Sequence, residues 1–214
     1  MKSASLSKRF LFLIYVLIWF FSPVLVAQQH IQRQLDLSNV QHININANKS
    51  FKVHVKTTNT TRAEVTLKSE GEYGNQLALI TTIKNDTLYI SSEFQPLFKV
   101  FDDKLAAHKV ISLELMISLP EGKDVYLKSD LANVFCKGRF NRVVVELVNG
   151  QFHGNNMQGN AIINTIRGNI YIKTLYTEQS YFKSQNRTSK TIVNNVFKQT
   201  LNSINGDIFI SKTE

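Results

Sequence analysis

The sequence predicts an all-β fold in which alternating N-terminal strands continue into a small single-stranded β-solenoid of about five rungs of 18–19 residues. Two observations predict this fold class. Apolar and polar residues alternate with period two through much of the chain. In addition, the segment 163–172 (INTIRGNIYI) recurs further along the chain as 201–210 (LNSINGDIFI). Self-similarity of this kind is typical of stacked β-coils, each of which buries its apolar residues against its neighbours.

The bulk composition fits one globular domain. The chain has 214 residues, of which 43% are hydrophobic and 19% charged, so it is not of the disordered class. Its formal net charge of +9 is spread along the chain without long runs of one sign. Such a weakly basic surface could attract acidic polysaccharide or anionic lipid, or simply confer solubility. No nucleic-acid-binding motif is present, which argues against nucleic acid as a partner.

Residues 1–27 have the layout of a secretory signal peptide. Lys2, Lys8 and Arg9 form a basic region, and an unbroken apolar run follows at 10–21. A helix of that length covers about 18 Å, less than the ~30 Å of a bilayer core. We therefore expect an exported protein that is periplasmic, surface-located or secreted, and not integral to the membrane after cleavage. An uncleaved N-terminal membrane anchor is the alternative.

The expected mature chain, 28–214, is interpreted as a single β domain in three parts. Residues 28–92 alternate with period two and carry the N-terminal strands. Residues 93–110 break the alternation around Pro96, which predicts an insertion loop that packs on the sheet or serves as a lid or docking segment. Residues 111–214 begin with another strand and then carry the solenoid rungs.

The rungs are defined by two columns of apolar residues. Steps of one rung length connect the first column, which consists of Leu127, Val145, Ile163, Phe182 and Leu201. The second column consists of Val134, Phe152, Ile170 and Ile208. Asn149-Gly150, Arg167-Gly168 and Asn205-Gly206 are expected at corners, where glycine supplies a positive φ. The fourth rung is irregular, which predicts a small insertion near residues 186–188.

An aromatic column follows the second apolar column by one residue. It consists of Phe135, His153, Tyr171 and Phe209, and strand alternation points these side chains to the outer face. If nothing covers them, they form a stripe for a ligand or partner, because exposed apolar patches usually mark interaction sites. Cover by the N-terminal strands is the alternative.

The repeat also carries a family resemblance. The motif is clearest at 203–208 (SINGDI) and weaker at 165–170 (TIRGNI). Together with the leader and the alternating strands, it resembles the adhesins of bacterial envelopes, which include the auto-transporter adhesin head domains of the GIN type. The resemblance implies a β-solenoid, an exported location and an adhesive role, and it supplies no catalytic residues. Few glycines, the irregular fourth rung and the 93–110 insertion depart from the family pattern.

The sequence shows no motif for catalysis, and we expect no enzyme activity, no cofactor and no metal site. None of the five histidines pairs with another at the spacing of a metal site. The single cysteine, Cys136, excludes an intramolecular disulfide. A polysaccharide-processing enzyme is one alternative, because stacked β-coils also carry such activities when acids cluster on one wall. The rungs offer Asp130, Glu146, Glu178 and Asp207.

These observations predict an exported binding or adhesion module of a cell envelope or surface, with a surface glycan or an envelope protein as partner. A purely structural envelope protein is the second alternative. The final rung ends shortly after Ile210 without an obvious cap. An open strand edge can pair with another chain, so we also expect end-to-end self-association.

Overall fold

The computed structural model describes residues 29–71, 76–95, 112–175, 178–184, 187–193 and 196–213. The expected signal peptide, most of the 93–110 insertion and part of the expected 186–188 loop lie outside these residues. The elements within the described ranges are all β strands, in agreement with the predicted class. They are β1 (Gln29–Asp36), β2 (His42–Asn46), β3 (Lys52–Thr58), β4 (Arg62–Glu70), β5 (Leu77–Lys84), β6 (Thr87–Phe94), β7 (Ser112–Pro120), β8 (Asp124–Ser129), β9 (Asn133–Asn149), β10 (Phe152–Arg167), β11 (Ile170–Thr174), β12 (Glu178–Ser184), β13 (Arg187–Val193), β14 (Lys198–Ser203) and β15 (Ile208–Lys212).

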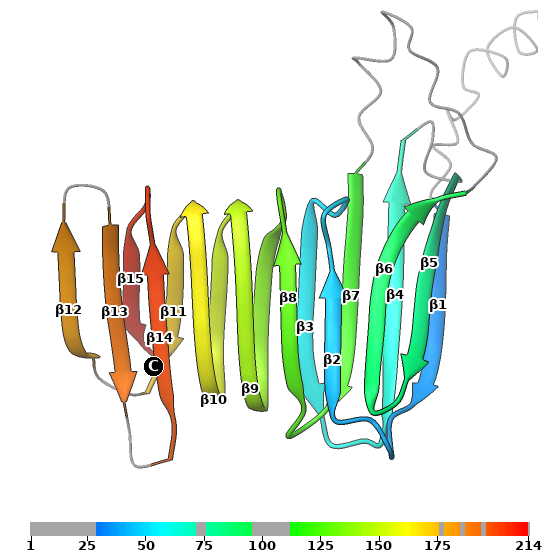
Figure 1. Cartoon of the computed structure of the whole chain (residues 1–214), viewed down its shortest axis with the longest axis horizontal. Coiled ribbons are helices and arrows are strands. Elements are labelled where there is room, and N and C mark those ends of the chain that lie inside the picture. The colour runs from blue at the N-terminus through cyan, green and yellow to red at the C-terminus, as the bar shows by residue number, and fades with distance from the viewer. Residues whose placement is uncertain are drawn as a thin grey trace, which may run out of the picture.

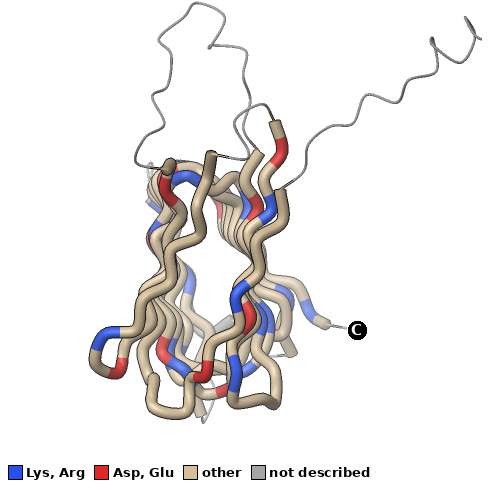
Figure 2. Tube along the Cα trace, turned by 90° about the vertical axis from the view of Figure 1, so that its right-hand side faces the viewer, with Lys and Arg blue, Asp and Glu red and all other residues tan. Residues whose placement is uncertain are grey.

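These strands form one sheet that folds back on itself into a flattened, nearly closed barrel-like tube with two facing walls (Figures 1 and 2). The first wall runs β1-β4-β7-β3-β9-β10-β11-β15. The second wall runs β5-β6-β2-β8-β9-β10-β14-β13-β12. The long strands β9 and β10 contribute their first halves to the first wall and their second halves to the second wall.

The interior is filled by the apolar side chains that alternate along both walls. In the first wall, Val134, Phe152, Ile170 and Ile208 are buried and lie in register on neighbouring strands. The second predicted column is therefore confirmed. In-register parallel strands place equivalent residues about 4.8 Å apart, so each apolar side chain packs on its counterparts above and below.

The first predicted column is correct at four of its five positions. Each of these four residues pairs with the next across neighbouring strands β8, β9, β10 and β14: Leu127, Val145, Ile163 and Leu201. Phe182 is not part of this column. It lies in β12, which pairs antiparallel with β13, and β13 pairs antiparallel with β14. The predicted fourth rung is thus an antiparallel hairpin that extends the second wall, and the predicted stack of five rungs is wrong in that respect.

The N-terminal strands β2 and β3 take part in the parallel stack. Ile45 of β2 pairs with Leu127, and Val53 of β3 pairs with Val134. The two N-terminal strands therefore lie beside β8 and β9 as neighbours in the same walls. They precede the rungs in the chain, and no pattern in the sequence predicted this pairing.

The glycines of the repeat have two different roles. Gly150 has a positive φ of 122°, as expected for a tight corner. Gly168 and Gly206 are not among the positive-φ residues, so the predicted reason for glycine is wrong at these two corners. A Cβ atom would lie 1.8 Å from the Gly150 carbonyl oxygen at Gly168, and 2.4 Å from the Gly168 carbonyl oxygen at Gly206. Glycine is needed there because successive corners stack backbone on backbone.

Hydroxyl side chains that point into the interior form hydrogen bonds to the same corners. Ser203 is fully buried, and its hydroxyl donates to the Gly168 carbonyl oxygen at 2.9 Å. The Thr165 hydroxyl donates to the same oxygen at 2.8 Å. A buried hydroxyl needs such a partner, which explains why small hydroxyl residues precede these corners in the sequence.

Among the described residues, no helix has the length and apolar character to cross a membrane.

Candidate binding face on the first wall

The outer face of the first wall carries a ladder of five stacked rings. The ladder consists of His54, Phe135, His153, Tyr171 and Phe209, which come from β3, β9, β10, β11 and β15. Neighbouring ring centroids are 4.7–5.0 Å apart, and neighbouring ring planes are within 9–14° of parallel. The four residues predicted as an outer stripe therefore lie in one continuous column.

The parallel register produces this arrangement. Ring residues at equivalent positions of adjacent strands are held one strand spacing apart. At that distance the rings fit side by side only when their planes are nearly parallel. An aromatic pair contributes about 0.5–1.5 kcal/mol beyond the burial of its area. The ladder thus stabilises the first wall, and it leaves the ring edges on the outer face.

Within the part of the chain that the structure describes, the N-terminal strands do not cover the ladder. β3 lies beside β9 in the same wall and extends the ladder by supplying His54. Phe209, at the other end, is 48% exposed, and Tyr171 is partly exposed. A groove of about 510 Å³ runs along the ladder from His54 to Phe209. The side chains of the ladder are therefore accessible from the groove.

Because the rings cover one another, most of their faces are not free to stack on a sugar ring. The two end rings are the exceptions, each on one face. β15 pairs only with β11 among the described strands, so the outer face of the Phe209 ring has no further ring upon it, whereas His54 is paired on its other side with Met116 of β7. The other rings present C–H and N–H edges, which carry the positive part of the ring quadrupole. The groove is thus suited to polar or negatively charged groups along most of its length.

Two polar columns flank the ladder. The column two residues before it contains Lys52, Asn133, Gln151, Asn169 and Asp207, and the column two residues after it contains Lys56, Lys137, Asn155, Lys173 and Ser211. Lys52 lies over the Phe135 ring with its Nζ atom 5.6 Å from the centroid.

Hydrogen bonds tie the first polar column to the ladder. The Asn169 Nδ2 atom donates to the Tyr171 hydroxyl at 3.0 Å, and the His153 Nε2 atom lies 3.2 Å from the Gln151 Oε1 atom. Asn133 and Asn169 accept backbone N–H bonds from Gln151 and Asp207, both at 2.9 Å. These bonds fix the amide column at one border of the groove.

Both ladder histidines have a lowered pKa. For His153 the cause is burial between the two neighbouring rings. For His54 the larger cause is also burial, followed by the positive charge of Lys52, and Glu114 at 3.2 Å acts in the opposite direction. Both imidazoles are therefore held toward their neutral form.

His54 was missed as a ladder member. The sequence places it in an alternating strand (FKVHVK, 51–56), but no repeat motif connects that strand to the rungs. Only the pairing of β3 with β9 brings His54 beside Phe135. The alternation of apolar and polar residues predicts that the His54 side chain points outward, but it does not predict which strand lies beside β3.

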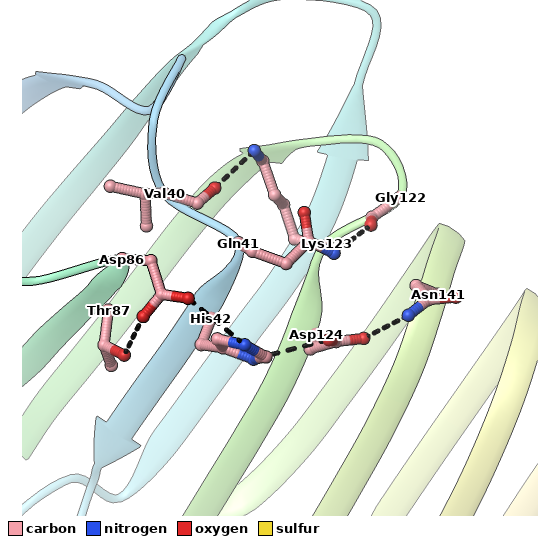
Figure 3. A network of polar contacts seen from close by, with 9 residues as sticks. All are labelled: Val40, Gln41, His42, Asp86, Thr87, Gly122, Lys123, Asp124 and Asn141. Carbon is pink, nitrogen blue, oxygen red and sulfur yellow. Dashed lines mark hydrogen bonds and ion pairs between the residues drawn. The ribbon is translucent and has the colours of Figure 1, made fainter.

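A second polar cluster lies at the ends of β2, β6 and β8 on the other wall (Figure 3). The His42 Nε2 atom is 3.6 Å from Asp86, and its Nδ1 atom is 3.3 Å from Asp124. The Asn141 amide donates to Asp124, and the Gln41 amide donates to the Gly122 carbonyl oxygen at 3.1 Å. Because these contacts join neighbouring strands that are in register, we interpret the cluster as stabilising the order and register of β6, β2 and β8.

Of the four acids considered for catalysis, Asp130, Glu146 and Glu178 belong to the second wall and Asp207 to the first. Asp130 and Glu146 line a groove of about 770 Å³ on the second wall, and Glu146 accepts a 2.6 Å hydrogen bond from the Tyr126 hydroxyl. Asp207 precedes β15 in the first wall, and Glu178 begins β12.

Cys136 is buried in the interior, and burial raises the pKa of its thiol to about 12.

No family model matches the chain, and no curated protein matches it either. Similar solved structures exist. A proposed cell adhesion protein from Clostridium sporogenes has a TM-score of 0.55 at 10% identity, over 87% of this chain and 100% of that chain. A proposed adhesin from Bacteroides fragilis has a TM-score of 0.34 at 12% identity, over 86% of this chain and 97% of that chain. The first likeness shows a shared fold.

Proposed function

We propose that this chain is an exported, non-catalytic binding module of a bacterial cell envelope or surface, and that it holds a surface glycan along the aromatic ladder. The observation that carries the proposal is the continuous column of five rings in an open groove, ending in the 48% exposed ring of Phe209. Partly exposed rings that line an open groove form the kind of apolar patch that marks an interaction site.

Two other observations support an adhesion-type role. The protein from Clostridium sporogenes with the same fold is itself described as a proposed cell adhesion protein. The sequence motif at 203–208 resembles that of bacterial envelope adhesins, including the GIN-type head domains of auto-transporter adhesins. The apolar leader at 1–27 supports export, with the alternative of an uncleaved anchor.

Binding of residues 28–214 to a glycan array tests the proposal. We expect binding by the wild-type chain and a loss of about fivefold or more in Tyr171→Ala and Phe209→Ala, since partly exposed aromatic contacts contribute on the order of 1 kcal/mol. Tyr89→Ala is the matched control, because Tyr89 is 45% exposed but lies on β6 of the second wall.

Two results would overturn the proposal. One is the absence of any bound glycan, which would leave the structural envelope role. The other is binding that falls equally in Tyr89→Ala and Tyr171→Ala, which would place the ligand away from the ladder.

A further inference from the structure

The column that follows the ladder contains three lysines. Lys56, Lys137 and Lys173 come from β3, β9 and β11, with Asn155 of β10 between the last two. All of these side chains are exposed, and all line the same groove as the rings. The lysines therefore form one row parallel to the ladder from His54 to Tyr171, and Ser211 takes the last position beside Phe209.

The lysine row does not stabilise the sheet that carries it. Lys56 and Lys137 are directly paired on neighbouring strands, and like charges in that position are destabilising. Among the described residues, no carboxylate forms an ion pair with any of the three lysines. On the opposite border, by contrast, Lys52 lies 3.6 Å from Glu114. Local conflicts without compensation within the fold are typical of functional sites.

We infer that the lysine row binds the carboxylate or sulfate groups of a linear acidic polysaccharide that lies along the ladder. This inference rests on the proposed function and names its ligand class. Lys137 and Lys173 are two strands apart, about 10 Å. That spacing suits acidic groups that recur on one side of an extended sugar chain. The ring edges beside the row add the positive part of the ring quadrupole.

The shape of the site favours a polymer over a lipid surface or a peptide. The cations follow one line beside a groove of about 510 Å³ and are not spread over a broad face, as a membrane surface would require. The line also runs across the strands of a wall whose backbone groups are already paired, so an extended peptide finds no strand edge along it. A flexible chain of charged sugars matches both features.

The test measures binding of residues 28–214 to polygalacturonate and to carboxyl-reduced polygalacturonate, which has the same chain without the charges. The test variant combines Lys56→Gln, Lys137→Gln and Lys173→Gln. The control variant combines Lys84→Gln, Lys128→Gln and Lys198→Gln, which remove the same charge from exposed positions of the second wall. Phosphatidylglycerol vesicles and polyglutamate serve as the two other anionic probes.

We expect the wild-type chain to prefer the acidic polymer, and the test variant to lose about tenfold or more of that affinity, with little change in the control. Higher salt should weaken binding of the wild type more than that of the test variant. Equal binding of both polymers, with ladder dependence retained, would overturn the lysine inference and leave the proposed function intact. Preference for vesicles or polyglutamate would also overturn it. No binding to any polymer, together with an empty glycan array, would remove both proposals.

Discussion

Gly168 and Gly150 lie in backbone contact, such that a Cβ atom on Gly168 would be 1.8 Å from the Gly150 carbonyl oxygen. This contact joins two successive corners of the parallel stack, and Gly206 repeats it one corner further on. The glycine of the repeated motif is therefore a packing requirement, because it lets the corners stack at the spacing of the hydrogen-bonded strands that carry the ladder.

Gly168→Ala should lower the free energy of unfolding by about 1–3 kcal/mol, because the added methyl group forces the two corners apart. Urea unfolding followed by tyrosine fluorescence measures the change. Asn205→Ala is the control, since Asn205 is an exposed corner residue whose backbone N–H bond to Ile166 remains. An unchanged midpoint in Gly168→Ala would contradict the stacked-corner arrangement.

The hairpin of β12 and β13 interrupts an otherwise regular spacing. The paired residues Val145 and Ile163 are separated by one rung length of sequence, whereas the paired residues Ile163 and Leu201 are separated by two. Deletion of residues 176–195 removes the excess and restores the shorter spacing. We expect the deleted chain to fold with its ladder intact but with lower stability, because it loses the pairing of β13 with β14 and the buried side chain of Ile192.

Circular dichroism and glycan binding check this deletion. Retention of the β spectrum and of ladder-dependent binding is the expected outcome. A chain that fails to fold when the hairpin is removed, while a deletion within residues 97–110 is tolerated, would show that the parallel stack cannot fold without the hairpin.

The lowered pKa values of His54 and His153 predict a pH dependence of stability. Because folding lowers both values from 6.5, the unfolded chain binds more protons in the window just below pH 6.5. The free energy of unfolding should therefore be fully retained above that window and should fall as the pH is lowered through it.

Denaturant midpoints between pH 7.5 and pH 5 measure this dependence. The double variant His54→Phe/His153→Phe keeps five stacked rings and removes both titrating groups, so its midpoint should vary less over the window. A steeper dependence in the variant than in the wild type would contradict the assignment to the ladder histidines.

The sequence predicted the four-residue stripe and most of both interior columns because in-register parallel strands repeat the same residue type at a fixed spacing. It failed at Phe182 because an antiparallel hairpin alternates apolar and polar residues just as a coil does. The step to Phe182 agreed with the repeat by coincidence. The placement of His54 depends on a pairing between segments that lie far apart in the sequence, and no local pattern encodes that pairing.

Two described strands, β15 in the first wall and β12 in the second, form the edges at the C-terminal end of the sheet. Unpaired strand edges can pair with another chain, so we predict end-to-end self-association that increases with concentration. Sedimentation velocity over a wide concentration range measures it. Phe209→Lys places a charge on β15 and should reduce association, whereas a constant monomer mass at every concentration would contradict the prediction.

Hydroxyl-radical footprinting asks whether a bound ligand lies along the ladder, on which both proposals depend. The fragment 28–214 is oxidised with and without saturating polygalacturonate, and modification is quantified for each aromatic side chain. Phe209 and Tyr171 should be protected by the ligand, whereas Tyr89, with its comparable exposure of 45% on the second wall, should be oxidised equally in both samples. Protection of Tyr89 without protection of Phe209 and Tyr171 would show that the ligand binds elsewhere.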